Sequence, residues 1–204
     1  MLSEFARNIC NRIKHIVLDY AHPLPERVEV YMGRHDSTER AIIKELLCHT
    51  NFLDGIAHVV ARGRTPTIWL GKEAKCAAKG CMPICRYISR LYRLYPVNPE
   101  NALFIDSSLE LLECFIEADE EGRVSILTTL ESRMSKEHDE YEGCYMEGFE
   151  RESVADICWS AALREEYHEL SEETFPRVTQ WLSLMEDRHT ESDSEDTDTD
   201  GKNE

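Results

Sequence analysis

The sequence predicts a small α/β domain followed by an all-helical domain in a chain of 204 residues. Strand-like and helix-like patterns are mixed up to residue 96, only helical patterns follow, and a hydrophobic content of 42% is ample for a core. The expected divisions are an additional N-terminal helix at 1–25, the α/β domain at 26–96, the helical domain at 97–189 and a disordered acidic tail at 190–204.

The first expected element is an amphipathic helix over residues 3–20. Its apolar residues recur about every four positions, at Phe5, Ile9, Ile13, Val17 and Tyr20. The prolines of His22-Pro-Leu-Pro25 end this helix. Residues 27–32 alternate between apolar and polar side chains, which predicts the first strand.

A second helix is expected to begin at Asp36-Ser-Thr-Glu39, which has the form of a capping box. Its apolar positions are Ile42, Ile43, Leu46 and Leu47. Three short strands are then expected, over residues 56–61, 65–70 and 73–78. Pro66 is acceptable near the start of its strand, and Gly80 precedes a helix over 82–95 that Pro96 stops.

The remaining elements are all helical. Helices are expected over residues 99–118, with Leu103, Leu109, Leu112 and Phe115 facing inward, and over 123–140 and 175–185. Between the last two, Ser153 and Asp156 form a Ser-x-x-Asp capping box. The helix that they open is apolar on nearly every side, so it belongs in the middle of a domain.

The charge of the chain favours basic partners and disfavours nucleic acid. Of the net charge of −17, residues 190–204 contribute −6 from seven acids and one lysine, which leaves −11 for residues 1–189. No apolar run is long enough to span a membrane, and the start does not resemble a signal peptide. A cytoplasmic or nuclear protein is expected, and a homodimer stays open.

Eight cysteines are present, and Cys81 and Cys85 are the only close pair. A zinc site needs a second such pair, so no metal is expected and most cysteines are interpreted as small core residues. A weaker hypothesis is a thiol redox protein that uses Cys81 and Cys85. A helix would present these two residues on one face, in a geometry that opposes disulfide closure.

Four motifs together resemble the glutathione S-transferase superfamily. They are Thr65-Pro66, Ile84-Cys-Arg-Tyr-Ile-Ser-Arg-Leu-Tyr92, the Ser153-x-x-Asp156 box and Phe175-Pro-Arg-Val-Thr-Gln-Trp-Leu182. They occur in the order that the superfamily shows. The resemblance implies a thioredoxin-like N-terminal domain, a transferase C-terminal-like helical domain and glutathione as the cofactor.

The resemblance also implies glutathione-binding residues. Thr65 and Pro66 match the pair whose cis bond lets the preceding backbone contact the cysteinyl unit of glutathione. Cys81 matches a serine that binds the γ-glutamyl end, and its backbone N–H can still hold a carboxylate. Gly80 stands where the superfamily has a glutamate, so one anchor is missing.

The residue that would activate the glutathione thiol is ambiguous. Candidates at the expected place are Tyr31, His35 and Ser37. Ser37 lies at a helix start, which suits a thiolate, but a plain N-cap explains it as well and is the preferred interpretation. The link between the second and third strands is also too short for the helix that the superfamily has there.

These departures predict a protein-interaction module with weak or no glutathione conjugation. The alternative is an active glutathione S-transferase, in which Ser37 or Tyr31 activates the thiol and Thr65, Pro66 and Cys81 bind the peptide. The interaction role requires no cofactor, and its expected partner is a protein, which the acidic chain would favour if basic.

Overall fold

The computed structural model describes residues 28–32, 37–50, 57–60, 65–70, 75–138, 145–146, 151–166 and 170–192. The helix predicted at 3–20 and the tail after residue 192 lie outside these ranges. No helix within these ranges is both long enough and apolar enough to cross a membrane.

Four strands form one mixed sheet in the order β2-β1-β3-β4. They are β1 (Val28–Tyr31), β2 (Ala57–Val60), β3 (Thr67–Leu70) and β4 (Lys75–Lys79). β1 runs parallel to β2 and antiparallel to β3, which pairs antiparallel with β4. The predicted sequence of one strand, a helix, three strands and a helix is confirmed.

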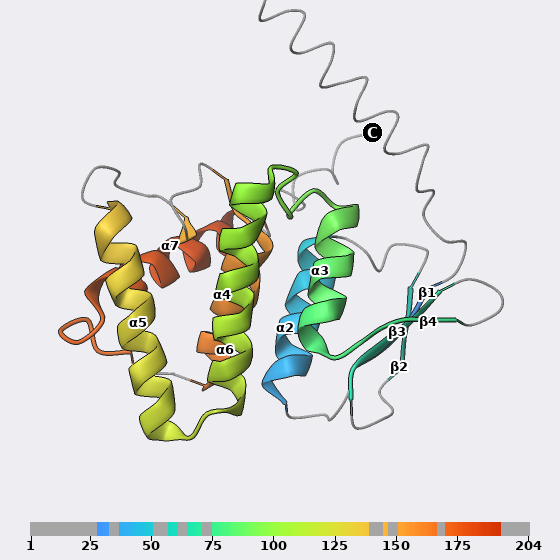
Figure 1. Cartoon of the computed structure of the whole chain (residues 1–204), viewed down its shortest axis with the longest axis horizontal. Coiled ribbons are helices and arrows are strands. Elements are labelled where there is room, and N and C mark those ends of the chain that lie inside the picture. The colour runs from blue at the N-terminus through green and yellow to red at the C-terminus, as the bar shows by residue number, and fades with distance from the viewer. Residues whose placement is uncertain are drawn as a thin grey trace, which may run out of the picture.

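Two helices, α2 (Thr38–His49) and α3 (Cys81–Leu91), lie together on one side of this sheet (Figure 1). Val30 and Ile68 are fully buried on the covered face of the sheet. In α2 the predicted apolar residues Ile42, Ile43 and Leu46 are likewise buried. This layer of strands under two helices is the thioredoxin-like domain.

Four helices build the second domain: α4 (Pro99–Glu117), α5 (Glu120–His138), α6 (Val154–Glu166) and α7 (Pro176–Ser192). Helix α6 is central, because every residue from 153 to 163 is buried. It packs against α2 on one side and α4 on the other. The prediction of an apolar core helix is confirmed.

The start of α6 is held by the predicted capping box. Asp156 Oδ2 accepts hydrogen bonds from the Ser153 backbone N–H at 2.8 Å and the Ser153 hydroxyl at 2.6 Å. Its Oδ1 accepts from the Met146 N–H at 2.8 Å and from the Trp181 indole at 3.0 Å. Burial raises the pKa of Asp156, and these hydrogen bonds oppose that rise. One buried carboxylate therefore ties α6 to residue 146 and to α7.

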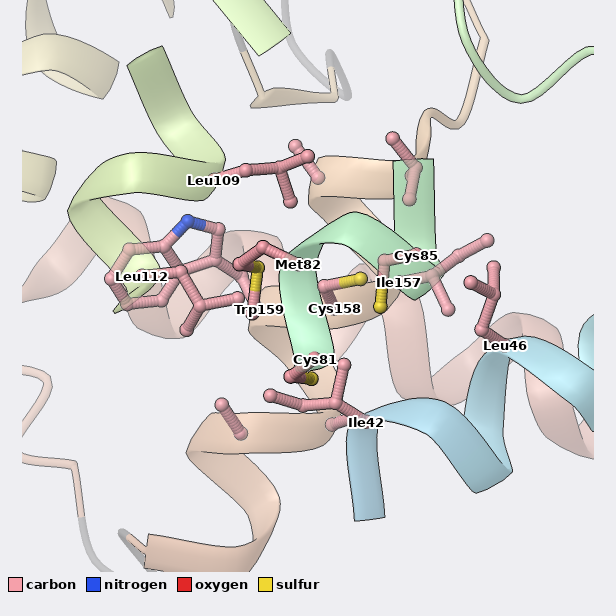
Figure 2. Packing of buried hydrophobic residues seen from close by; sticks show 14 of the residues in the cluster. Ile42, Leu46, Cys81, Met82, Cys85, Leu109, Leu112, Ile157, Cys158 and Trp159 are labelled. Atoms are coloured by element: carbon pink, nitrogen blue, oxygen red, sulfur yellow. The ribbon is translucent and has the colours of Figure 1, made fainter. Parts of the chain in front are cut away.

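One hydrophobic core crosses both domains. Figure 2 shows Met82 and Cys85 of α3 near Cys158 and Trp159 of α6, with Leu112 of α4 beside them. The Trp159 indole donates to the Ser108 carbonyl at 3.1 Å, and its ring lies 5.4 Å from that of Phe115. Helix α6 thereby supplies core residues to both parts of the chain.

Two polar side-chain contacts join the domains where α2 packs against α6 and the residues just before it. His49 Nε2 lies 3.3 Å from Glu152 Oε2, and Arg164 Nη2 lies 3.0 Å from Glu45 Oε1. Burial, followed by the nearby Asp156 and Glu45 carboxylates, raises the pKa of Glu152 to about 7. The surroundings of the Glu152 carboxyl at the domain boundary therefore disfavour its charged form.

Three predicted details are wrong. Leu103 is 68% exposed, since it lies two residues before the buried Ile105 and hence on the opposite side of α4. Helix α3 ends at Leu91, because Arg93 adopts a left-handed φ of 62° and Leu94 N–H bonds back to the Ser89 carbonyl. Helix α7 extends to Ser192, three residues into the predicted tail, and no proline or glycine stands in its way.

Candidate functional site

The residues proposed to bind glutathione gather where α2 and α3 begin. The Cys81 thiol, at the start of α3, donates to the Glu39 carbonyl in the first turn of α2 at 3.6 Å. Pro66 joins them, since its carbonyl accepts from the Gly80 N–H at 2.9 Å. The structure therefore brings Ser37, Pro66 and Cys81 to one end of the thioredoxin-like domain. Two helix N-termini at one place favour a bound anion.

Ser37 is the N-cap of α2. Its side-chain oxygen accepts from the Arg40 N–H at 3.3 Å, and its backbone is extended, with φ −106° and ψ 142°. The predicted box starting at Asp36 is thus shifted by one residue, and Arg40 supplies no carboxylate to complete it. Asp36 and His35 lie outside the described residues. The preferred interpretation of Ser37 as a structural cap agrees with this geometry.

Tyr31 faces away from the two helix starts. Its hydroxyl donates to Glu29 Oε2 at 3.1 Å, and the two residues share a face of β1 because they are two apart. Val30 between them is fully buried on the opposite face, toward α2 and α3. The Tyr31 hydroxyl therefore lies on the face of the sheet opposite to the one that α2 and α3 cover.

The Thr65-Pro66 bond differs from what the resemblance implied. No cis peptide bond occurs among the described residues, so this bond is trans. Pro66 is buried directly before the first residue of β3. A proline is tolerated at this position because its missing N–H is not needed for pairing within the sheet. Thr65 is exposed, and its carbonyl accepts from the Thr67 hydroxyl at 3.2 Å.

Gly80 caps α3 without a side chain. Its φ of 99° and ψ of 158° belong to a region that is essentially restricted to glycine. A Cβ there would have space, because its nearest neighbour would be Pro83 Cδ at 3.6 Å. The backbone, rather than crowding, therefore favours glycine over the glutamate that the superfamily places here.

The Cys81 side chain is turned into the core. It is only 6% exposed, and a hydrogen bond with Cys85 together with burial raises the pKa of its thiol well above the usual range. The same causes raise the pKa of Cys158. Cys81 therefore stays a neutral thiol, which is a weak donor and a poor nucleophile.

Acidic residues that the sequence analysis missed surround the start of α2. Burial raises the pKa of Glu39, and the carboxylates of Glu117 and Glu113 at the end of α4 add to the rise. These residues are more than 70 positions from Glu39, so no local pattern pointed to them. Their charges oppose a thiolate and the carboxylates of glutathione.

One cation at this site was also missed. Arg40 lies in the first turn of α2, and its Nη1 is buried without a hydrogen-bond partner among the described residues. A guanidinium is the side chain best suited to hold a carboxylate. Arg40 is the one cationic side chain in the described first turn of α2.

Solved structures share this arrangement of a thioredoxin-like domain and a helical domain. Ure2p in complex with glutathione is 10% identical, with a TM-score of 0.61 over 85% of this chain and 95% of that one. The chain has the fold of the glutathione transferases. A theta class glutathione S-transferase from Xanthomonas axonopodis pv. citri is 17% identical, with a TM-score of 0.58 over 81% of this chain and 94% of that one.

A third transferase-fold structure has glutathione in its active site. It is the maleylacetoacetate isomerase from Anaeromyxobacter dehalogenans 2CP-1, which is 12% identical, with a TM-score of 0.56 over 78% of this chain and 89% of that one. No family model and no curated protein matches the sequence. The chain thus shares the transferase fold with these proteins, and its function depends on its own residues.

Proposed function

We propose that this chain is a divergent protein of the glutathione transferase fold that acts by binding another protein, with weak or no conjugation of glutathione. The observation that carries the proposal is the start of α3. Gly80 has no side chain to hold the γ-glutamyl group, and the Cys81 thiol is buried and bonded to the Glu39 carbonyl.

Neither of the two described candidates for activating the thiol is placed to do so. The Ser37 oxygen caps α2, and the Tyr31 hydroxyl bonds to Glu29 on the other face of the sheet. A thiolate near Ser37 would meet the carboxylates of Glu117 and Glu113, which add to the rise that burial causes in the pKa of Glu39. Conjugation depends on a bound thiolate, so each feature lowers the expected rate.

The test is a calorimetric titration of the full chain with glutathione. We expect no saturable heat up to about 10 mM glutathione, a concentration at which any site of useful affinity would fill. Saturable binding with a dissociation constant below about 1 mM would show that the start of α3 does hold glutathione, and it would remove the observation that carries the proposal.

The second candidate is an active glutathione S-transferase, and Arg40 is the observation that favours it. Its buried Nη1 lacks a partner among the described residues and lies on the helix that Ser37 caps. In this alternative Arg40 holds a carboxylate of glutathione. Binding in the titration that is lost in Arg40→Gln and kept in the exposed control Lys44→Gln would favour the enzyme.

A further inference from the structure

One face of the four-stranded sheet carries no helix of the described part of the chain. The helices α2 and α3 lie on the other face, where Val30 and Ile68 are fully buried (Figure 1). Side chains alternate along a strand, so the neighbours of these two residues point to the uncovered face, where they are partly exposed. We call this the outer face of the sheet, and its described residues are Glu29, Tyr31, Thr67 and Trp69.

The outer face presents a continuous patch with two large aromatic side chains. It lies on β1 and β3, the two inner strands of the sheet. In their register Glu29 lies opposite Trp69, and Tyr31 lies opposite Thr67, so the four side chains are direct neighbours. Tryptophan and tyrosine have much apolar surface, and a covering layer would stabilise it by burial.

The connection between β2 and β3 is too short to supply that layer. Val60 at the end of β2 and Thr67 at the start of β3 both pair with Tyr31, one on each side of β1. The six residues 61–66 join them. A connection that contains a helix needs about 10–12 residues. The layer therefore has to come from another part of the chain.

Residues 3–20 have the sequence pattern of such a layer. As a helix they would be about 27 Å long, which is enough to cross the sheet. Amphipathic helices are stabilised mainly by packing of their apolar side, so this one requires a surface to pack on. The large apolar side chains that would follow one side of the helix are Phe5, Ile9, Ile13, Ile16 and Tyr20.

The place of this stretch in the chain brings it to the sheet. The seven residues 21–27 join it to Val28, where β1 begins between β2 and β3. Seven extended residues reach about 23 Å, whereas a strand of four residues is only about 13 Å long. Charge agrees, because residues 3–20 have three basic and two acidic side chains in a chain of net charge −17.

We propose that residues 3–20 form a helix whose apolar side packs on the outer face of the sheet, over Tyr31 and Trp69. The sheet then has helices on both faces, and the additional N-terminal helix belongs to the thioredoxin-like domain. This inference concerns the folded unit itself and does not depend on whether the chain binds glutathione.

Hydrogen–deuterium exchange of the full chain, read by mass spectrometry, tests this docking. The amides of residues 3–20 should exchange roughly a hundredfold more slowly than those of a synthetic peptide of the same sequence. Ile9→Asp with Ile13→Asp should remove most of this protection. The matched control is Asn8→Asp with Asn11→Asp, which adds the same charge away from the apolar side and should keep the protection.

Variants of the sheet identify the docking surface. Trp69→Asp should release residues 3–20 while α6, in the core, stays protected. If Trp69→Asp also exposes α6 and has therefore unfolded the chain, Thr67→Glu on the same face should release the segment without unfolding. Val124→Asp is the control, because Val124 is exposed on α5, at the other end of the molecule (Figure 1).

Three results would overturn the proposal. The first is exchange of residues 3–20 in the full chain as fast as in the peptide. The second is full protection of this segment in a folded Trp69→Asp or Thr67→Glu variant, which would place its docking surface elsewhere. The third is protection that increases with protein concentration, which would assign the outer face to the segment of a second copy.

Discussion

Asp156 shows how much one buried side chain does in this molecule. The sequence motif accounts for its two bonds to Ser153. The bonds from Met146 and Trp181 could not be predicted, since those residues are 10 and 25 positions away and no local spacing relates them to Asp156. The motif therefore predicted a helix cap, and the structure shows in addition that Asp156 links α6 to residue 146 and to α7.

Replacing Asp156 with alanine should cost more than an ordinary helix cap. The change leaves buried N–H groups of Ser153, Met146 and Trp181 without acceptors, so we expect a loss of about 3 kcal/mol in the free energy of unfolding. Ser153→Ala should lose about 1 kcal/mol. Urea unfolding checks both, and an Asp156→Ala variant as stable as Ser153→Ala would contradict the network.

Gly80 tests the conformation at the start of α3. Gly80→Ala should destabilise the chain by about 1–2 kcal/mol, because a φ of 99° is costly for alanine. The neighbouring Lys79→Ala, at an exposed position, should change the stability by less than about 0.5 kcal/mol. Urea unfolding of the pair is the measurement. Equal stabilities would mean that Gly80 is not held in this conformation.

Glu152 should make stability fall as the pH rises. Its pKa in the folded chain is about 7 against an ordinary 4.5, so the folded state holds a proton that the unfolded state releases. This contribution is complete below pH 4.5 and is lost as the pH rises through 7. The titratable groups around it are His49, Glu45 and Asp156.

Glu152→Gln removes this titration. Between about pH 5 and about pH 8, the wild type should lose stability relative to Glu152→Gln in urea unfolding. The exposed control Glu165→Gln should follow the wild type throughout. A constant difference between Glu152→Gln and the wild type over this range would refute the shifted pKa.

Helix α4 shows how far the spacing of apolar residues predicts a single helix. Its bounds were predicted to within a residue, as were three of the four residues placed on its inner face. Leu103 was misplaced because a leucine near a helix start fits an apolar run whether or not it faces the core. The side chain that does face the core there is Ile105.

A pair of alanine substitutions tests this assignment. Leu109→Ala should lower the free energy of unfolding by about 2–5 kcal/mol, since it opens a cavity in the core. Leu103→Ala should change it by less than about 0.5 kcal/mol. Thermal or urea unfolding distinguishes the two, and a large loss in Leu103→Ala would place that residue in the core after all.

For the whole molecule, element order predicted an α/β domain followed by a helical domain, and the resemblance of four motifs to the glutathione S-transferase superfamily supplied the thioredoxin-like fold. The site was less predictable. The sequence indicated Ser37, Pro66 and Cys81, which lie at the same end of the thioredoxin-like domain. It also indicated Tyr31, whose side chain lies on the face of β1 opposite to the helices. The carboxylates of Glu113 and Glu117 near Glu39 depend on domain packing, which no local pattern encodes.

The most direct test of the central claim is the rate of glutathione conjugation to a generic aryl halide, with an active transferase as the positive control. Under the proposed function the chain should give a rate equal to that of the reaction without protein, because Gly80 supplies no anchor, the Cys81 thiol is buried and the start of α2 is acidic. Turnover well above that background, lost in Ser37→Ala and kept in the exposed control Val124→Ser, would contradict the account and identify the chain as a working transferase.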